Sequence, residues 1–247
     1  MIDKDTFKLS VIIPCYNEKQ TIGAILKKVI QSLQNYKFLN YEILIIDDHS
    51  KDGTVEILKD LSQEEKIEVY FHESNLGKGA AIQTALRYVT GDIIIIQDAD
   101  LEYDPNDYFI LIQPIINQSV KVVYGSRVLD KDRYTSKAFT SLFRIFCNHI
   151  LTIVSNIINS QKLTDAHTCY KVFRADIFNK VTLEENGFNF CPEVTTKLSN
   201  LGIDILEVPI NYNGRSYKEG KKIRFVDGLI AIKTLFKYKF FKNVALQ

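Results

Sequence analysis

Residues 92–102 read DIIIIQDADLE, a run of four isoleucines followed by three acidic residues within five positions. A strand made of this run has no polar side, so it is expected to be buried on both faces. Strands buried in this way are typical of parallel sheets that lie between two layers of helices. Such sheets bind their ligands beyond the carboxyl ends of the strands. The stretch therefore predicts an α/β fold and places its candidate site directly after Gln97.

Strands and helices alternate along the first half of the chain. Short apolar runs predict strands at residues 9–14, 42–47, 67–71, 92–97 and 120–125. Apolar residues at helical spacing predict helices at 21–33, 54–61 and 79–89, and Asp104 with Pro105 opens another. The repeated strand–helix–strand order predicts an open, mostly parallel sheet flanked by helices.

The second half has longer and less regular segments. We expect a long apolar helix at 139–158, an irregular or short-stranded segment at 165–174, a helix at 193–201, an extended segment at 205–212 and a basic amphipathic helix at 225–241. No linker rich in Pro, Gly or Ser separates the two halves. The sequence therefore predicts one domain over residues 1–247, in which residues 215–247 form a basic loop and an amphipathic helix.

The composition excludes several classes of protein. Of the 247 residues, 46% are hydrophobic and 25% are charged, a balance that excludes a disordered chain. The four cysteines form no CxxC pair, which fits a reduced, cytoplasmic protein without a zinc site. Neither a signal segment nor an uncharged apolar run of about 18 residues is found, so a spanning helix is not expected. The GxGxxG fingerprint of dinucleotide-dependent dehydrogenases is also missing.

Charge is distributed unevenly along the chain. Residues 215–247 hold nine Lys or Arg and two Asp or Glu, a net charge of +7, whereas the whole chain has +1. A basic end on an acidic body predicts an anionic partner near the C-terminus. A nucleic acid is not the expected partner, because the body is acidic and no nucleic-acid-binding motif is present.

Four of the predicted strands end in polar residues. The strand ends read PCYNE (14–18), DDHS (47–50), DADLE (98–102) and GSR (125–127). Asp98 and Asp100 are two residues apart, so both carboxylates can turn to one centre where the strand becomes a loop. Carboxylate oxygens are hard ligands that suit Mg²⁺ or Mn²⁺ and leave positions open for substrate phosphates. The alternative is that the two side chains only cap a helix or stabilise the loop.

A glycine-rich segment, NLGKG (75–79), precedes a predicted helix. Backbone N–H groups at a helix N-terminus bind phosphate, so this segment is a candidate phosphate cradle. The competing interpretation is a tight turn with a solvated lysine at Lys78.

Taken together, these motifs resemble the family 2 glycosyltransferases of the nucleotide-diphospho-sugar transferase (GT-A) fold. The resemblance is to the dolichol-phosphate mannosyltransferase type and its bacterial polyprenyl-phosphate relatives. It extends from about Leu9 to about Gly228, and the motifs occur in the family's order. Besides the strand ends and NLGKG, the matching pieces are DAHTCYKVFR (165–174), Glu193, VPI (208–210) and RSYKEGKK (215–222).

The resemblance implies a nucleotide pocket at the first two strand ends. Pro14, Tyr16 and Glu18 match residues that hold the base and ribose of the sugar donor. Ile46 and Asp48 match positions that close the same pocket.

The resemblance also implies a metal and diphosphate site. Asp98, Ala99 and Asp100 match the loop that binds the metal, Mg²⁺ or Mn²⁺, and the diphosphate. Glu102 stands where relatives often have Gln as a further metal ligand, so here it would add charge. Arg127 matches a phosphate-binding arginine. Arg215 and Lys221 match a basic pair on a late loop that closes over the phosphates.

The implied activity is inverting, metal-dependent transfer of a hexose from a GDP- or UDP-linked sugar to a polyprenyl (dolichyl or undecaprenyl) phosphate. A lipid phosphate is already anionic near neutral pH and needs no strong base. One alternative is a saccharide acceptor in surface-polysaccharide assembly, for which Asp165 or Glu193 would have to serve as the general base. Otherwise Asp165 is a turn or helix cap and Glu193 belongs to a solvated helix face. A further alternative is a non-catalytic subunit that binds nucleotide-sugars.

The predicted C-terminal helix has an apolar stripe of five residues at helical spacing, namely Phe225, Leu229, Ile232, Phe236 and Phe240. Lysines cluster toward its end, and a basic amphipathic helix of this kind can lie in an anionic membrane interface. The alternative is an ordinary helix packed on the sheet with a solvated basic edge. The first reading predicts a cytoplasmic protein with peripheral contact on the cytoplasmic face of a membrane.

Overall fold

A computed structural model describes residues 7–36, 40–63, 65–129, 139–215 and 225–241. Within the fifth and eighth α-helices, side chains are described from Ile145 and from Asp227 onward.

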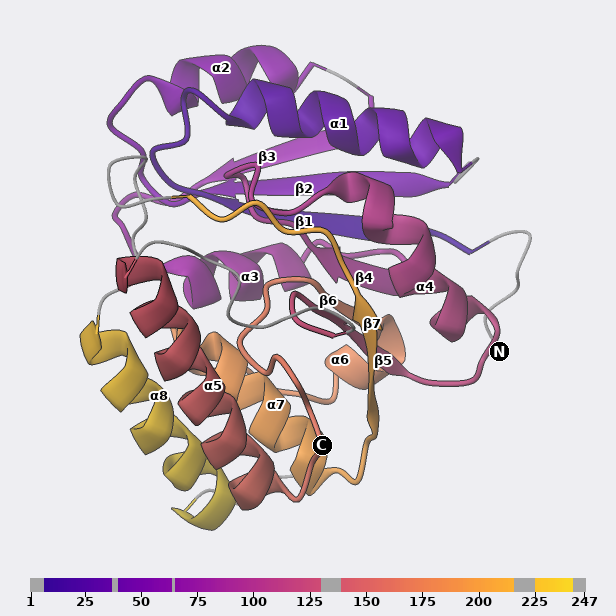
Figure 1. The fold of residues 1–247 in the computed structure, drawn as a ribbon. Helices are drawn as coiled ribbons and strands as arrows, with labels where there is room; N and C mark the ends of the chain where they lie inside the picture. The colour runs from indigo at the N-terminus through magenta and orange to yellow at the C-terminus, as the bar shows by residue number, and fades with distance from the viewer. Residues whose placement is uncertain (1–6, 37–39, 64, 130–138, 216–224, 242–247) are drawn as a thin grey trace.

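The fold is built on one seven-stranded sheet with the order β3-β2-β1-β4-β6-β5-β7 (Figure 1). The strands are β1 Leu9–Cys15, β2 Tyr41–Asp47, β3 Ile67–Phe71, β4 Ile93–Ile96, β5 Val122–Ser126, β6 Lys171–Arg174 and β7 Ile205–Pro209. Only β6 runs antiparallel to its neighbours, β4 and β5, and the other pairings are parallel. The prediction of a mostly parallel open sheet is confirmed.

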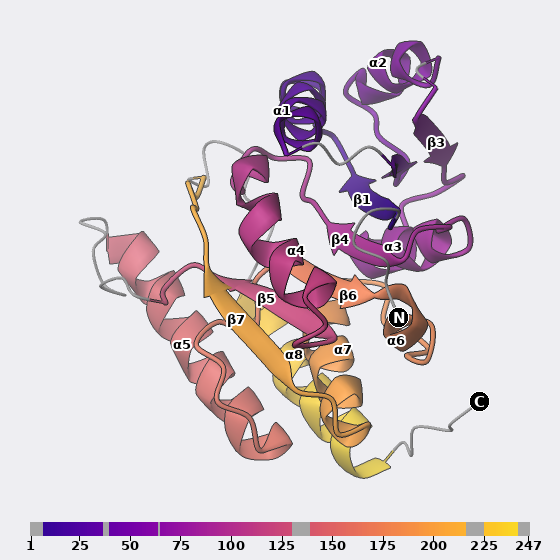
Figure 2. The ribbon, with the colours of Figure 1, turned by 90° about the vertical axis from the view of Figure 1, so that its right-hand side faces the viewer.

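Helices cover both faces of the sheet (Figures 1 and 2). They are α1 Ile22–Asn35, α2 Thr54–Leu61, α3 Lys78–Leu86, η1 Pro105–Asp107, α4 Tyr108–Ile116, α5 Phe139–Asn159, α6 Ala175–Phe178, α7 Phe190–Asn200 and α8 Phe225–Phe236 followed by the π-turn η3 Lys237–Phe241. Tyr36 at the end of α1 stacks on Phe109 of α4, with 5.0 Å between ring centroids. These two helices share one face, and α3 lies on the other (Figure 2).

The isoleucine run forms β4 at the centre of the sheet. All four of its side chains are fully buried, as the sequence predicts. β4 pairs with β1 on one side and with β6 on the other. Burying one isoleucine contributes roughly 1.5–3 kcal/mol, so this run is a strong determinant of the sheet. It gives the loop that begins at Asp98 a rigid support.

Two predicted helix starts differ from the structure in detail. The Asp52 carboxylate accepts a hydrogen bond from Thr54 N at 3.1 Å, but the N-cap position is Gly53, which has a φ of +97°. Asp104 caps the 3₁₀ turn η1 through Asn106 N at 3.1 Å, and α4 continues from this turn. In both places an aspartate satisfies backbone donors that a helix start leaves free.

The last third of the chain adds a cluster of three helices. α5, α7 and α8 contact one another, and Figure 1 shows α5 and α8 side by side at one end of the molecule. The main contacts of α8 are with these helices and not with the sheet. The alternative in which the C-terminal helix packs on the sheet is therefore wrong. The helix predicted at 193–201 begins earlier, at Phe190.

Candidate active site

Asp98, two residues after the end of β4, and Lys78, the first residue of α3, form an ion pair. Lys78 Nζ lies 2.5 Å from Asp98 Oδ1 and also donates to the Cys169 thiol at 3.3 Å. Both charged side chains are mostly buried. The interpretation of Lys78 as a solvated turn lysine is therefore wrong. Its ammonium group lies among the charged side chains that follow the strand ends, which we call the strand-end cluster.

Arg215 joins segments that are far apart in the sequence. Its guanidinium donates to Asp100 at 2.8 Å and to the two carboxylate oxygens of Glu18 at 3.1 and 3.2 Å. The Arg215 side chain thus reaches residues that follow β1 and β4, and its predicted role in binding the phosphates stays a prediction. Lys221, the other predicted basic residue, lies outside the described residues.

Glu102 holds the segment that carries Arg215. One carboxylate oxygen accepts from the Tyr212 hydroxyl at 2.6 Å and the other from Arg215 N at 2.7 Å. Glu102 is buried. Both oxygens are engaged with protein donors, so this arrangement favours a role in holding Tyr212 and Arg215 over the predicted role as a third metal ligand.

Negative charge exceeds positive charge around residues 98–100, which we call the DAD loop. Burial raises the pKa of Asp100, repulsion from Asp98 and Glu102 adds to this, and Arg215 offsets only part, so the pKa is raised to about 6. Burial also opposes ionisation of Asp98, but the Lys78 ammonium outweighs it and the pKa of Asp98 lies below its ordinary value. A second cation near Asp100 would relieve this repulsion.

A divalent cation fits this donor set. Asp98 and Asp100 offer hard carboxylate oxygens, which Mg²⁺ and Mn²⁺ prefer. Across the described ranges of the chain, no three His, Cys, Asp or Glu side chains converge as a complete metal site. Phosphate oxygens and water would have to complete the coordination, as is usual for a metal that binds with a nucleotide.

The predicted nucleotide-binding residues considered next lie at the ends of β1 and β2 and, for Ala99, after β4. Pro14 and Tyr16 are half-buried, whereas Ile46 and Ala99 are fully or nearly fully buried. Asp48 accepts from Leu76 N at 2.8 Å and from Gly77 N at 2.7 Å. Its carboxylate therefore shapes the glycine-rich segment that leads to Lys78, in addition to any role next to a nucleotide.

Arg127 and Asp165 form a buried bidentate pair. Arg127 Nε and Nη2 lie 2.6 and 2.7 Å from the two oxygens of Asp165, which also accepts from Asn148 of α5 at 3.2 Å. Burial alone would raise the pKa of Asp165, but Arg127 and the hydrogen bonds lower it to about 2. A carboxylate this weakly basic is unsuited to general-base catalysis at neutral pH. Its contacts favour a role in orienting Arg127.

Glu193 is fully buried in α7. Its oxygens accept from Glu184 N at 2.8 Å and Glu185 N at 2.9 Å, and Lys197 Nζ lies 2.7 Å away. This differs from the solvated helix face that the sequence offered as an alternative. The contacts favour a structural role over that of a base.

His167 is half-buried and has an unsatisfied ring nitrogen. Its Nε2 is buried and makes no hydrogen bond. Burial lowers its pKa to about 4, with repulsion from Lys171 adding to the effect, so the imidazole is neutral at pH 7.

Comparison with known proteins decides the family. The glycosyl transferase family 2 profile matches residues 10–182. The chain belongs to glycosyltransferase family 2. This family 2 glycosyltransferase is 30% identical over 245 residues to a UDP-N-acetylglucosamine–dolichyl-phosphate N-acetylglucosaminyltransferase of Methanococcus voltae. The matched region covers 92% of this chain and 93% of that protein. It is 26% identical over 255 residues to the dolichyl-phosphate beta-glucosyltransferase ALG5A of Trichomonas vaginalis, with 99% and 76% covered.

Solved structures support the GT-A fold. Glucosyl-3-phosphoglycerate synthase from Mycobacterium tuberculosis, in complex with Mn²⁺, uridine diphosphate and phosphoglyceric acid, gives a TM-score of 0.69 at 18% identity, over 97% of this chain and 81% of that one. The same enzyme with Mg²⁺ and uridine diphosphate gives 0.68 at 21% identity, with 97% and 82% covered. At this identity the likeness concerns the fold.

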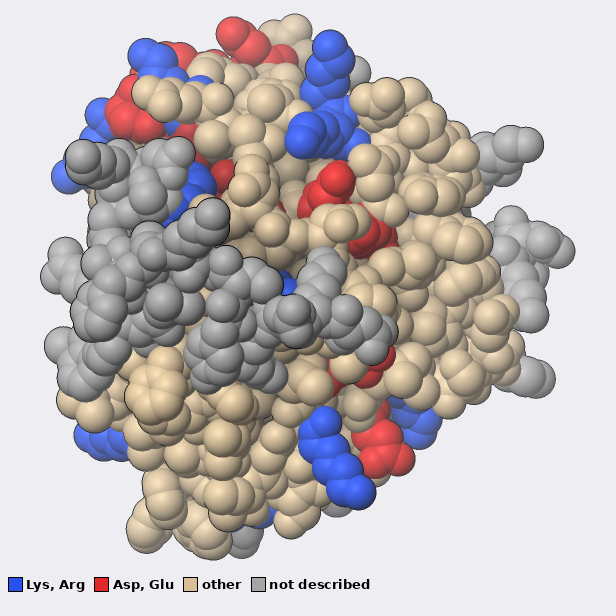
Figure 3. All heavy atoms as spheres, viewed as in Figure 1, with Lys and Arg blue, Asp and Glu red and all other residues tan. Residues whose placement is uncertain are grey.

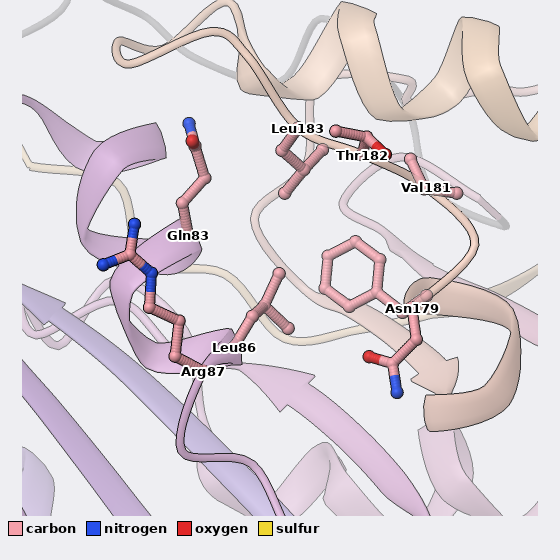
Figure 4. A pocket seen from close by; sticks show the side chains of 8 residues that line it. Gln83, Leu86, Arg87, Asn179, Val181, Thr182 and Leu183 are labelled. Atoms are coloured by element: carbon pink, nitrogen blue, oxygen red, sulfur yellow. The ribbon is translucent and has the colours of Figure 1, made fainter. Parts of the chain in front are cut away.

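A surface pocket of the glycosyltransferase lies apart from this cluster (Figure 4). Gln83 and Leu86 of α3 and Arg87, which caps this helix, line one side, and Phe178, Asn179 and Val181–Leu183 line the other. No carboxylate lines it, so it lacks the donor set found after β4.

Sequence reasoning placed Lys78 in a candidate phosphate cradle without singling out its ammonium group, and it gave Tyr212 no role in the candidate site of this glycosyltransferase. The signal for Lys78 was present in NLGKG, where a lysine opens the helix that follows the third strand. Tyr212 had no local signal, because its contact with Glu102 joins residues 110 positions apart.

Proposed function

We propose that this glycosyltransferase transfers a hexose from a nucleotide-diphospho-sugar to a polyprenyl phosphate with inversion and with the help of Mg²⁺ or Mn²⁺. The observation that carries the proposal is the pair Asp98 and Asp100, set among Lys78, Arg127 and Arg215 at one sheet edge. The named dolichyl-phosphate transferases among its relatives support the acceptor class. The UDP-sugar in the name of the first relative favours UDP over GDP as the donor nucleotide.

The residues around the carboxylates suit a departing nucleotide diphosphate. A divalent cation held by Asp98 and Asp100 would supply charge stabilisation for the phosphates. Arg127, Lys78 and Arg215 would add positive charge, and the fork of an arginine matches phosphate oxygens. Lys78 and Arg215 would then exchange a carboxylate partner for a phosphate partner.

The acceptor step needs little from the protein. A phosphate monoester oxygen attacks the anomeric carbon, the new C–O bond forms as the bond to the diphosphate breaks, and the electron pair leaves with the diphosphate. No proton has to be removed from an anionic oxygen. This agrees with the contacts of Asp165 and Glu193, both of which are unsuited to general-base catalysis.

The exposed apolar residues support a lipid-borne acceptor. We define the apolar face as Phe146, Ile150, Ile153 and Ile157 of α5 together with Leu229, Phe236 and Phe240 of α8 and η3. The α5 residues follow helical spacing, and Ile157 is 74% exposed. In Figure 3 the lower part of the molecule, over α5 and α8, is largely uncharged.

Lysines on α8 and η3 complement the apolar face. Lys233 is exposed, and Lys237 and Lys239 are partly exposed. Apolar side chains flanked by lysines favour binding to the surface of an anionic bilayer. We therefore propose peripheral contact with the cytoplasmic face of a membrane. Within the described residues no helix is long and apolar enough to span a membrane.

A transfer assay tests the proposal. The protein is incubated with polyprenyl phosphate, Mn²⁺ or Mg²⁺ and labelled UDP- or GDP-sugars, and label is expected in the lipid fraction with one donor class. A thermal-shift screen chooses the donor first, because a ligand at 100 times its Kd stabilises a protein by about 2.7 kcal/mol. Failure to label lipid across all donors would contradict the proposed acceptor.

Two other functions give different results in the same assay. A saccharide acceptor would place the label in a soluble product, and Glu193→Gln or Asp165→Asn would then abolish transfer. A non-catalytic subunit would give no transfer with any acceptor, while still binding the nucleotide-sugar.

A further inference from the structure

Residues 184–187, which we call the bridging segment, pack against the N-terminus of α3. Asn186 O accepts from Ala80 N at 3.1 Å, and Glu185 O accepts from Gln83 Nε2 at 3.2 Å. A Cβ on Gly77 would clash with Asn186 O, and one on Gly79 would clash with Glu185 O. The two backbones therefore touch without intervening side chains, directly on either side of Lys78.

Side chains of α7 hold the bridging segment in place. Glu193 accepts from the backbone N–H groups of Glu184 and Glu185 at 2.8 and 2.9 Å. Lys197 compensates the buried charge of Glu193 at 2.7 Å and also donates to Thr182 O at 2.5 Å. The segment therefore has little freedom to move independently of the helices around it.

The third support of the bridging segment comes from η3. Lys237 Nζ lies 2.5 Å from Glu185 Oε1, and the Tyr238 hydroxyl donates to the same oxygen at 2.8 Å. Tyr238 is fully buried, and Lys197 lies over its ring at 4.2 Å. Phe240 and Phe241, at the end of η3, are strongly exposed. η3 therefore contacts the bridging segment through two of its side chains and exposes two aromatic side chains on the protein surface.

We propose that Lys237 and Tyr238 are positioning residues for Lys78. They hold Glu185, the bridging segment holds the first turn of α3, and this turn sets the Lys78 ammonium against Asp98. Contacts between packed backbones transmit small displacements, and coupling between two sites is reciprocal. Contact of η3 with a bilayer would then change the affinity of the site for a nucleotide diphosphate and its metal. Binding of the nucleotide and metal would in turn change the affinity of η3 for the bilayer. This inference rests on the proposed function for the role of Lys78 and of the bilayer.

The chain offers a matched control for the test. Lys239 lies in the same turn and has the same charge, but its Nζ contacts Ser199 Oγ at 3.4 Å and not the bridging segment. Lys237→Gln and Lys239→Gln therefore remove the same charge from η3, and only Lys237→Gln removes a contact with Glu185. Tyr238→Phe removes the second contact and keeps the ring, and Lys237→Arg keeps the cation.

Two readouts are needed, and neither uses turnover. Amide hydrogen exchange of residues 77–81 is expected to be about three- to tenfold faster in Lys237→Gln and Tyr238→Phe, while exchange in β1 and β4 is unchanged. Calorimetric titration with UDP and MnCl₂ is expected to show a three- to tenfold weaker affinity in the same variants. Lys239→Gln is expected to match the wild type in both, and Lys237→Arg to restore both.

Equal exchange and equal affinity in Lys237→Gln and Lys239→Gln would overturn the inference. Uniformly faster exchange across the sheet would also overturn it, because the role would then be general stability. Neither readout requires sugar transfer, so a wild-type protein that fails to label polyprenyl phosphate contradicts the proposed function without affecting this result.

Discussion

Each carboxylate of the DAD loop has a cationic side chain as its partner. Lys78 pairs with Asp98, and Arg215 pairs with Asp100 while also contacting Glu18. The sequence predicted Asp98 and Asp100 because acidic residues follow a buried strand. It could not predict the pairing with Lys78, because the distance between these side chains depends on how α3 packs against the sheet.

Removal of the Lys78 charge tests this arrangement at the level of one residue. Lys78→Gln leaves Asp98 mostly buried without its cation, and breaking such a pair costs about 3 kcal/mol of unfolding free energy. Mn²⁺ is expected to reduce this deficit, because the metal supplies the missing positive charge. Urea unfolding with Mn²⁺ and with a chelator measures both effects, and Lys59→Gln on the exposed side of α2 is the control. A deficit that Mn²⁺ leaves unchanged would contradict the assignment.

The Arg127–Asp165 pair gives a prediction about pH. The folded-state pKa of Asp165, about 2, is below its ordinary value, so the pair stabilises the fold above about pH 4. This contribution is lost as the pH falls from about 4 toward 2. Asp165→Asn leaves Arg127 unpaired and is expected to lower the unfolding free energy by about 3 kcal/mol at pH 7.

The difference between wild type and Asp165→Asn should shrink as the pH falls through this range. Urea unfolding at pH 7, 4.5 and 3 measures it. A difference that stays constant down to pH 3 would show that ionisation of Asp165 does not contribute to stability.

At the scale of elements, the local patterns predicted most strands and helices to within a few residues. β1 to β5 were identified because each is a short apolar run between polar ends. β6 was left as irregular or short-stranded, because its four residues owe their strand form to pairing with β4 and β5. For the C-terminal helix, the spacing revealed an apolar stripe but not which side it faces. Leu229, Phe236 and Phe240 of this stripe turn out to be exposed.

The apolar face predicts how α5 meets a bilayer. Ile157→Glu places a charge on the most exposed described residue of the α5 stripe and is expected to weaken binding to anionic vesicles about tenfold. Ile110→Glu, on an exposed position of α4, is the control and should bind as the wild type does. Vesicle co-sedimentation measures both. Equal loss in the two variants, or no loss in Ile157→Glu, would contradict the assignment of this face.

At the scale of the whole molecule, the site is assembled by the topology of the sheet. Arg215 follows β7 at one sheet edge, yet its side chain reaches Glu18 after β1, 197 positions earlier in the chain. The rule that ligands bind beyond the carboxyl ends of parallel strands predicted where the site lies. It did not predict that Glu102 would hold Tyr212 and Arg215 or that Glu193 would be buried next to the bridging segment. Those contacts depend on packing between distant segments, which no local pattern records.

The most direct test of the central claim is the metal dependence of nucleotide binding. We expect calorimetry to show that Mn²⁺ strengthens binding of UDP to the wild-type protein at least about tenfold over a chelator. Asp100→Asn should lose this enhancement, whereas Asp176→Asn, an exposed aspartate paired with Arg174, should keep it. Equal affinity with and without Mn²⁺ in the wild type, or a full enhancement in Asp100→Asn, would contradict a cation site at the carboxyl end of β4.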